Sequence, residues 1–509
     1  MTNAVKMTQT SYPNPPKSLP NDTGPEDRAA YYKRLIGLGG GLLVFVLMVI
    51  SPSPEGLSRE GWYTAAIGVL MAFWWATEVI PIPITAMLPL VLFPVFNISN
   101  IAVAATPYAN PMIFLFMGGF ILAIGMLEWN LHRRIALNII VVIGSKPRSI
   151  ILGFIISTAV ISMWVSNAAA TMMMLPIALS VIDLIKSKQG DKNDSRQYGY
   201  FAVALMLAIA YAANVGGLGT VIGTPTNALM IGFVAESYNV EISFVQWMLI
   251  GIPLVVLGLP LIFYSLTYIS FPVRFKTLPG GREYILSELH KLGRFSKGEI
   301  LVAVVFGFTA LLWMIRPVLE RWMPAISDAS IAIFGAMLLF LIPLNFKAGQ
   351  YLLTWKAASK LPWGILILFG GGLSLAGAIQ RTGLAEWMGG YFAGLGGLPF
   401  VVVIFVVTTV VIVFTNLASN SATAAAFLPV MGSVAIGMGE DPLQLAIPVA
   451  VAASCVFMFP VGTPPNAIVY GSGVFSIPQM VRAGLWLNLL FTLLITLLTR
   501  YLFIYFFAG

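Results

Sequence analysis

The chain has 509 residues but little of what soluble proteins and many enzymes are built from. Only 9% of the residues are charged, two are histidines, and Cys455 is the single cysteine. Soluble domains contain about 25% charged residues, so this composition excludes a water-soluble globular protein. With one cysteine the chain cannot form an internal disulfide, and it does not indicate a cysteine-rich metal cluster or a thiol enzyme.

Apolar residues are abundant instead. They make up 58% of the chain, and the mean hydropathy is +0.89. Apolar runs long enough for a membrane-spanning helix, roughly 17 to 25 residues, recur from residue 35 to residue 507. These runs lack the polar–apolar alternation of barrel strands, and a helix satisfies its own backbone in lipid. We therefore expect an all-α polytopic protein of the lipid bilayer with about 11 transmembrane helices.

The distribution of charge predicts an orientation in the membrane. Residues 1–34 are polar and rich in proline, which is typical of a disordered cytoplasmic tail and not of a cleavable signal peptide. Lys33-Arg34 precedes the first apolar run, and the loop after that run is less basic. The positive-inside tendency predicts a cytoplasmic N-terminus and a multi-pass protein of the cell inner (plasma) membrane. The net charge of +8 then reflects orientation, and we expect no nucleic-acid partner.

The sequence contains one pattern twice. Ser166-Asn167-Ala168-Ala169 precedes Leu175-Pro176, and Ser419-Asn420-Ser421-Ala422 precedes Leu428-Pro429. The same spacing relates Gly118-Gly119 to Gly371-Gly372. A second motif follows each copy, namely Gly223-Thr224-Pro225-Thr226-Asn227 and Gly462-Thr463-Pro464-Pro465-Asn466. Two halves with polar, helix-breaking sequence in apolar surroundings are typical of a secondary transporter whose site lies between its repeats.

A basic segment separates the two halves. Residues 274–298 interleave arginines and lysines with leucines and a tyrosine. This pattern predicts a cytoplasmic linker, part of which is an amphipathic helix on the membrane surface. The first inverted repeat is then expected at 35–273 and the second at 299–509.

Each half also has an apolar segment interrupted by glycines, at 111–131 and at 363–383. These segments are short for two membrane crossings and contain glycines at their centres. We interpret each as a re-entrant helical hairpin that enters and leaves the membrane on the same side. The alternative is that the glycines allow two helices to pack closely.

The Ser-Asn sequences lie midway along apolar stretches, where a continuous helix would bury an amide and hydroxyls without partners. We therefore expect interrupted helices around 166–168 and around 419–421. Unwound backbone exposes carbonyls that bind a small cation, and the N-terminus of the resuming helix attracts an anion. A single Ser-Asn pair is as well explained by hydrogen bonds between helices, but the matched pair favours a binding site.

These paired motifs, each followed by a Gly-Thr-Pro-x-Asn sequence, resemble those of the divalent anion:sodium symporter (DASS) family, which includes the INDY-type di- and tricarboxylate transporters. The resemblance covers essentially everything after the tail. It implies a homodimer in which a transport domain moves against a fixed scaffold by an elevator mechanism. Members of the family couple sodium influx to uptake of di- or tricarboxylates or of sulfate, and some exchange one carboxylate for another.

The resemblance also implies site residues. The first sodium site is expected to use Ser162, Ser166, Asn167 and the Gly223 carbonyl, and its mirror Thr415, Asn420 and the carbonyls of Ala418 and Gly462. Substrate carboxylates are expected to meet Asn167, Ala168, Thr224, Ser419, Asn420, Ser421 and Thr463. Ala168 and Ser421 stand where dicarboxylate carriers usually have threonine, and this departure leaves citrate and sulfate open.

The predicted function is sodium-coupled symport of a C4-dicarboxylate such as succinate, malate or fumarate into the cell. The alternatives are a di/tricarboxylate exchanger, for example a citrate/succinate antiporter, and a sodium:sulfate symporter. Neither Ser-Asn motif contains a lysine or arginine, so bound cations would supply the charge opposite a dianion. The apolar segments contain neither a nucleophile with its base nor a pair of aspartates. We therefore expect no enzymatic activity, and no cofactor beyond the co-transported sodium ions.

Overall fold

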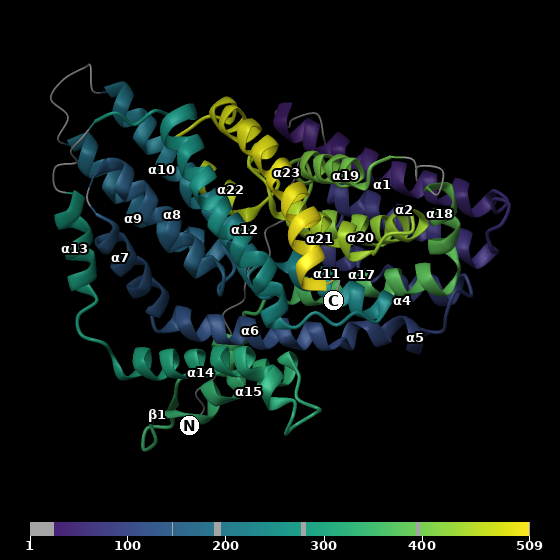
Figure 1. The fold of residues 1–509 in the computed structure, drawn as a ribbon, viewed down its shortest axis with the longest axis horizontal. Coiled ribbons are helices and arrows are strands. Elements are labelled where there is room, and N and C mark those ends of the chain that lie inside the picture. The colour runs from purple at the N-terminus through teal and green to yellow at the C-terminus, as the bar shows by residue number, and fades with distance from the viewer. Residues whose placement is uncertain (1–24, 145, 188–194, 276–280, 393–397, 508–509) are drawn as a thin grey trace, which may run out of the picture.

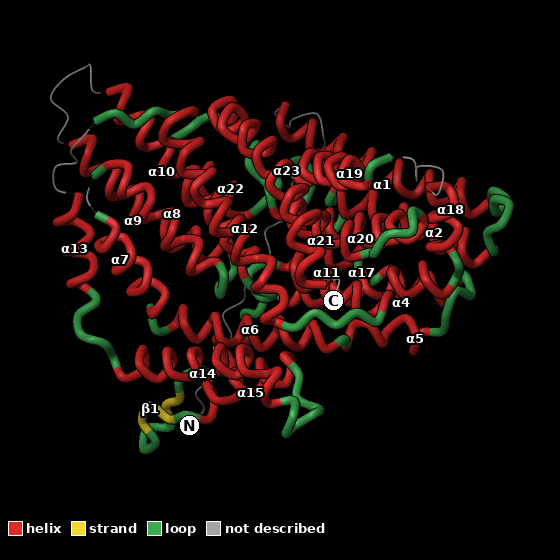
Figure 2. The backbone as a smooth tube through the Cα atoms, viewed as in Figure 1, coloured by secondary structure: helices red, strands yellow, loops and turns green. Residues whose placement is uncertain are grey.

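A computed structural model describes residues 25–144, 146–187, 195–275, 281–392 and 398–507. Most of this part of the chain is helical, with loops between the helices (Figure 2). The strands of the described residues are β1 (Pro343–Asn345) and β2 (Gln350–Tyr351), which form one short antiparallel pair. The all-α prediction is confirmed.

The helices follow one another along both halves (Figure 1). Those before the basic linker are α1 (Pro25–Ile50), α2 (Arg59–Thr77), α3 (Ile82–Thr85), α4 (Leu88–Val95), α5 (Ile101–Ala105), η2 (Thr106–Ala109), α6 (Pro111–Glu128), α7 (Leu131–Ile143), α8 (Pro147–Ser162), α9 (Asn167–Ser187), α10 (Ser195–Gly216), η3 (Gly217–Gly219), α11 (Pro225–Tyr238), α12 (Phe244–Tyr264) and the π-helix η4 (Ser265–Ser270). Those that follow are α13 (Gly281–Lys291), α14 (Lys297–Leu319), α15 (Asp328–Leu341), α16 (Trp355–Ala358), α17 (Trp363–Arg381), α18 (Leu384–Phe392), α19 (Phe400–Thr415), α20 (Asn420–Gly437), α21 (Leu443–Ser454), α22 (Pro464–Tyr470) and α23 (Ile477–Phe507).

The helices have the length and composition of a multi-pass membrane protein. Eight of the described helical segments are long and apolar enough to cross a bilayer, and six shorter apolar helices accompany them. Large apolar side chains remain exposed on α1, α14 and α23, including Ile50 (75%), Val304 (61%) and Leu485 (58%). A soluble protein would bury such surfaces, whereas a membrane protein presents them to lipid.

The N-terminal boundary differs from the predicted one. Helix α1 begins at Pro25, so residues 25–34 belong to a helix and not to the tail that was expected at 1–34. The rest of the predicted tail lies outside the described residues. Helix α13 lies in the linker, where part of the segment was expected to be helical. Arg133 of α7 forms an ion pair with Glu288 of α13, with a nitrogen–oxygen distance of 2.7 Å.

The predicted re-entrant hairpins at 111–131 and 363–383 are wrong. Helices α6 and α17 run without a break through their glycines. A Cβ atom at Gly118 would lie 2.6 Å from the Ala332 backbone, and one at Gly371 would lie 2.7 Å from Ala86 Cα. The glycines therefore allow α6 to approach α15 closely and α17 to approach the segment between α3 and α4. Close helix packing, the alternative interpretation, explains them.

Helical breaks do occur at both Ser-Asn motifs. Helix α8 ends at Ser162 and α9 begins at Asn167, while α19 ends at Thr415 and α20 begins at Asn420. The two helices of each pair pack against each other, and α10 lies beside both α8 and α9 (Figure 1). A short connection between packed helices makes a helical hairpin. The hairpins are therefore centred on the Ser-Asn motifs, where interrupted single helices were expected.

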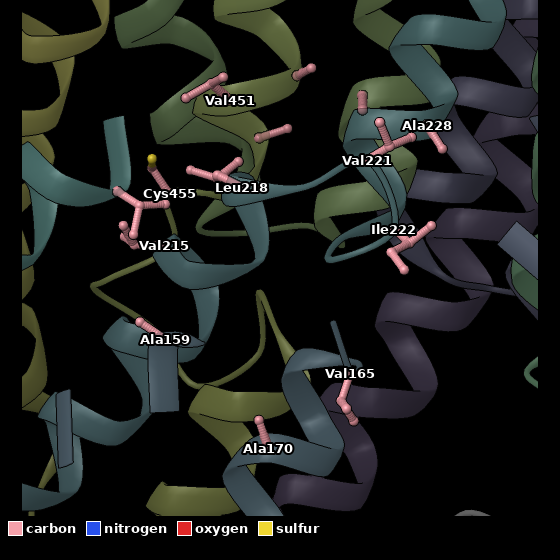
Figure 3. Close-up of a cluster of buried hydrophobic side chains, with 14 of the residues drawn as sticks. Ala159, Val165, Ala170, Val215, Leu218, Val221, Ile222, Ala228, Val451 and Cys455 are labelled. Atoms are coloured by element: carbon pink, nitrogen blue, oxygen red, sulfur yellow. The ribbon is translucent and has the colours of Figure 1, made fainter. Parts of the chain in front are cut away.

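The Gly-Thr-Pro motifs contain the other two breaks. Residues 220–224 separate η3 from α11, and residues 455–463 separate α21 from α22. Apolar side chains enclose these turns: Leu218, Val221 and Cys455 are each at most 1% exposed (Figure 3). Buried backbone outside regular helices needs other hydrogen-bond partners, which the side chains of the motifs supply.

Candidate functional site

A cavity of about 440 Å³ lies where the four helix breaks meet, two at the Ser-Asn motifs and two at the Gly-Thr-Pro motifs. Helices α11, α20 and α22 begin there, with Thr224, Ser419 and Thr463 as their N-cap residues. Helix α9 begins there at Asn167. The structure brings together every residue expected to meet substrate: Asn167, Ala168, Thr224, Ser419, Asn420, Ser421 and Thr463 all line the cavity.

The cavity has a mostly apolar wall with several polar groups and no charge. None of the described residues that line it has an ionisable side chain. Its polar groups are hydroxyls, amides and the backbone at the helix starts, while Phe120, Ile365 and Leu368 provide an apolar wall. A helix start presents unpaired N–H groups and the positive end of the helix dipole, so this arrangement suits an anion.

A compact group of oxygen atoms lies beside the first Ser-Asn motif. One amide position of Asn167 is 2.7 Å from Ser162 Oγ, 3.2 Å from the Ala213 carbonyl oxygen and 3.2 Å from the Gly223 carbonyl oxygen. Ser162 Oγ also donates to the Ala213 carbonyl at 2.8 Å. The amide nitrogen fits this position, because its two N–H groups can donate to these oxygens. With the amide turned the other way, its oxygen joins those of Ser162, Ala213 and Gly223, and the four come from α8, α9, α10 and the turn before α11. Neutral oxygens gathered in this way are ligands that hard cations accept.

The structure changes the predicted membership of this oxygen group at two residues, Ala213 and Ser166. The Ala213 carbonyl is a member that the sequence does not reveal, because a backbone oxygen inside a helix carries no residue signal. Ser166 lines the cavity, but its Oγ accepts from the Ala169 N–H at 3.4 Å and so caps α9. Gly223 is required at its position, because a Cβ there would lie 2.9 Å from Gly217 Cα.

The second motif has a related but different arrangement. Thr415 Oγ1 donates to the Ala453 carbonyl at 2.6 Å, which parallels the bond from Ser162 to Ala213. A Cβ on Gly462 would lie 2.7 Å from the Thr415 carbonyl oxygen, so these two residues are close together. Ala418, three residues after Thr415, is buried. The amide of Asn420 points elsewhere, because its Oδ1 accepts from the Ser421 N–H at 2.8 Å.

The asparagines that end the Gly-Thr-Pro motifs hold the turns in place. Asn227 Nδ2 donates to the carbonyls of Gly217 and Thr220, at 3.0 and 2.7 Å. Asn466 Nδ2 donates in the same way to Val456 and Phe459, at 3.1 and 3.0 Å. The N–H groups of these side chains therefore satisfy carbonyls that the helix breaks leave without partners.

Buried polar contacts also fasten the two halves to each other. Asn214 Nδ2 of α10 lies 3.2 Å from Thr463 Oγ1 and 3.3 Å from Asn466 Oδ1. A second contact joins the first turn of α11 to the end of α21, where Thr226 Oγ1 and Ser454 Oγ are 2.7 Å apart. All five side chains are at most 2% exposed. Asn214 is missed by motif analysis, although a lone asparagine in the apolar run that forms α10 is a signal that could have identified it.

Comparison with known proteins identifies the family of this chain. Residues 33–507 match the model of the sodium:sulfate symporter transmembrane region. The sodium-dependent dicarboxylate transporter SdcS of Staphylococcus saprophyticus is 43% identical over 482 residues, which cover 94% of this chain and 93% of the relative. SdcS of Staphylococcus aureus is 43% identical over 472 residues, which cover 92% and 91%.

Solved structures share the fold at low identity. The YdaH transporter of Alcanivorax borkumensis aligns with a TM-score of 0.52 and 14% identity, covering 92% of this chain and 97% of its own. MtrF of Neisseria gonorrhoeae aligns with a TM-score of 0.53 and 10% identity, covering 94% and 95%. The helical architecture is thus shared with these two proteins, and the family that matches the sequence consists of transporters and not of enzymes. The family model and the two SdcS relatives each match more than nine-tenths of this chain. The chain therefore belongs to the sodium:sulfate symporter (DASS) family.

Proposed function

We propose that this protein is a secondary active transporter that takes a C4-dicarboxylate such as succinate, malate or fumarate into the cell together with sodium ions. The observation that carries this proposal is the neutral cavity at four helix starts, with a group of oxygens beside it. Relatives at 43% identity are sodium-dependent dicarboxylate transporters, which supports the same ion and substrate class.

The first sodium ion would bind Ser162, Asn167 and the Gly223 carbonyl, with the Ala213 carbonyl as a further ligand. Ser166 would orient the start of α9. The mirror site would use Thr415, the carbonyls of Ala418 and Gly462, and Asn420 after its amide rotates away from Ser421. Neutral oxygens suit this role because they bind a cation without cancelling its charge.

The dicarboxylate would occupy the cavity between the two Ser-Asn motifs. Its carboxylates would accept hydrogen bonds from Thr224, Thr463 and Ser421, and from the side chains and helix starts at Ser419, Asn420 and Asn167. Because the lining residues carry no positive charge, the sodium ions would supply the opposite charge. Each ligand would then strengthen binding of the other by about 1–3 kcal/mol, the usual range of such reciprocal coupling.

Several features of this transport remain part of the proposal. The halves would be inverted repeats, the N-terminus would be cytoplasmic, and a homodimer in the plasma membrane would work by an elevator mechanism. The repeated motifs and the matched hydrogen bonds of Asn227 and Asn466 support an internal repeat. The second candidate is exchange of di- or tricarboxylates without sodium. Ala168, which lacks the usual hydroxyl, keeps citrate and sulfate among the candidate anions.

Uptake by proteoliposomes separates these mechanisms. Purified full-length protein is reconstituted into vesicles free of internal carboxylate, and uptake of labelled succinate is measured with an inward sodium gradient or an equal potassium gradient. Symport predicts succinate accumulation with sodium alone, and uptake of citrate and sulfate tested in the same vesicles gives the anion preference. Succinate uptake that occurs only into vesicles loaded with a carboxylate, with or without sodium, would show an exchanger and contradict the proposal.

A further inference from the structure

A second cavity, of about 290 Å³, lies far from the transport site. It is formed by the start of α10, the segment that follows the π-helix η4, and the first turns of α23. Arg196, Arg274 and Arg482 line it, one from each of these elements, and we refer to it as the arginine cavity. Arg196 and Ala213 are at opposite ends of α10, about 25 Å apart at 1.5 Å per residue.

Three like charges around one cavity repel each other unless an anion lies between them. Among the described residues, the arginines that form ion pairs are Arg133, Arg134 and Arg316, so none of those in the arginine cavity is paired. The other described lining residues are uncharged. Arginine forms fork-shaped hydrogen bonds that match phosphate and carboxylate oxygens, so the cavity has the charge and the donors of an oxyanion site.

A buried hydroxyl adds an independent sign of a ligand. Ser270, the last residue of η4, lines the arginine cavity and is 6% exposed, yet its Oγ has no hydrogen-bond partner among the described residues. An unpartnered buried hydroxyl destabilises the folded protein. Because less than 1 Å² of this Oγ is accessible, the side chain would rotate toward the cavity to donate to a phosphate oxygen there. The residue also ends a π-helix, a rare conformation that occurs frequently at functional sites.

The surroundings indicate a ligand with an apolar part. Ile269 lines the arginine cavity and is 50% exposed, and Tyr264 and Tyr268 are exposed near it and stack with ring centroids 4.4 Å apart. Tyr200, also in the lining, accepts hydrogen bonds from Arg196 at 2.9 and 2.7 Å. A basic pocket between the ends of membrane helices, with apolar side chains beside it, matches the head group and the first acyl carbons of an anionic lipid.

We propose that the arginine cavity binds the phosphate group of an anionic phospholipid, with Arg196, Arg274 and Arg482 as its positive contacts and Ser270 as a hydroxyl donor. Because the lining residues come from three elements, the bound head group would tie together α10, η4 and α23. The proposal does not depend on the transported substrate, since its site shares no residue with the transport cavity.

Native mass spectrometry of the full-length protein in detergent tests this proposal. Phosphatidylglycerol, phosphatidylcholine or inorganic phosphate is added in separate titrations. We expect phosphatidylglycerol to bind more tightly than phosphatidylcholine, and binding to weaken by about fivefold for each arginine removed in Arg274→Gln and in the Arg274→Gln/Arg482→Gln double variant. Ser270→Ala, which leaves all three charges in place, is expected to weaken binding less.

Arg321→Gln is the matched control, because Arg321 is exposed and lies outside the arginine cavity. It is expected to bind phosphatidylglycerol like the wild-type protein, and Arg274→Lys, which keeps the charge, is expected to bind more tightly than Arg274→Gln. Gel filtration identifies any variant that does not fold. Equal affinity for both lipids, or wild-type affinity in the folded double variant, would overturn the proposal. Binding of inorganic phosphate alone would show a free-anion site and overturn the assignment to lipid.

Discussion

The two Ser-Asn motifs start helices in the same way but use their asparagines differently. In the first, the amide of Asn167 faces Ser162 and the carbonyls of Ala213 and Gly223. In the second, the amide oxygen of Asn420 is bound to the Ser421 N–H at its own helix start. The backbone is therefore repeated, while the side chains have diverged.

One substitution accounts for much of this difference. Ala168 in the first motif corresponds to Ser421 in the second. Ser421 Oγ lies 3.3 Å from Asn420 Oδ1 and so adds a second donor to that oxygen, whereas Ala168 offers Asn167 no such donor. In the first motif the amide lies among oxygens of three other residues, whereas in the second the amide and the hydroxyl lie at the cavity wall. The same fold thus supplies two chemically different faces to one cavity.

Removing the two asparagines has the largest expected effect. Asn167→Ala and Asn420→Ala each lose hydrogen bonds or ligand contacts with charged groups, which are worth about 1.5–3 kcal/mol each. We expect both to abolish sodium-driven succinate uptake, with the apparent sodium affinity reduced more in Asn167→Ala than in Asn420→Ala.

Sodium titrations of binding measure this difference in affinity, and uptake into proteoliposomes measures the loss of transport. Folding is checked by gel filtration, and Asn345→Ala, at the exposed end of β1, serves as the control. Retained transport in both variants would remove the site assignment.

The next largest expected effect is a loss of stability when the asparagines of the Gly-Thr-Pro motifs are replaced by alanine. Asn227→Ala leaves two buried carbonyls without donors and is expected to destabilise the protein by about 2–4 kcal/mol. Asn466→Ala also removes an acceptor from Asn214, so its cost should be larger. Thermal unfolding midpoints in detergent provide the test, and a smaller loss in Asn466→Ala than in Asn227→Ala would contradict the role of Asn214 between the halves.

Exchanging the third residue of the motifs should have a moderate effect. Ala168→Ser gives the first motif the sequence of the second, and we expect it to bind the dicarboxylate more tightly by up to about tenfold, because one hydroxyl donor is added. Ser421→Ala makes the opposite change and is expected to weaken binding by a similar factor. Competition by unlabelled succinate during uptake measures both. Equal and unchanged affinities would show that this position does not contact substrate.

The smallest expected effect concerns His132, which stands in the first half where the second has Ala385. His132 is 6% exposed, and its burial, with a smaller contribution from Arg133, lowers its pKa below the usual 6.5 despite the hydrogen bond between its Nδ1 and the Met126 carbonyl. The unfolded chain therefore binds a proton first as the pH falls below about 6.5. Stability should be unaffected at higher pH and should decline from pH 6.5 down through the lowered pKa.

Thermal midpoints at pH 7.5 and 5.5 test this dependence. His132→Asn is expected to reduce the difference between the two midpoints. His290→Asn is the control, because His290 is exposed on α13 and is the other histidine of the chain. An undiminished difference in His132→Asn would assign the pH dependence to other groups.

The sequence predicts the breaks well because they carry a local signal. A serine, an asparagine and later a proline in apolar surroundings conflict with a continuous helix, and this conflict remains whatever packs against the segment. The cavity residues could be predicted for the same reason, since both copies of each motif stand out from their neighbours.

The glycine segments show where such prediction stops. Gly118 and Gly371 favour a break when the segment is considered alone, but the structure places Ala332 and Ala86 against them. Only knowledge of the neighbouring helix distinguishes a flexible point from a close contact. The Ala213 carbonyl and the orientation of Asn420 depend likewise on groups that are distant in the sequence or on side-chain geometry, neither of which local composition reveals.

The contacts of Asn214, Thr226 and Ser454 constrain how this molecule can change shape. Because they join the turn of one half to the turn of the other, the two turns cannot separate without breaking fully buried hydrogen bonds. A motion that exposes the cavity first to one side of the membrane and then to the other must therefore carry both turns along as one rigid piece. Any surface along which two parts of the protein slide past each other would then lie outside this junction.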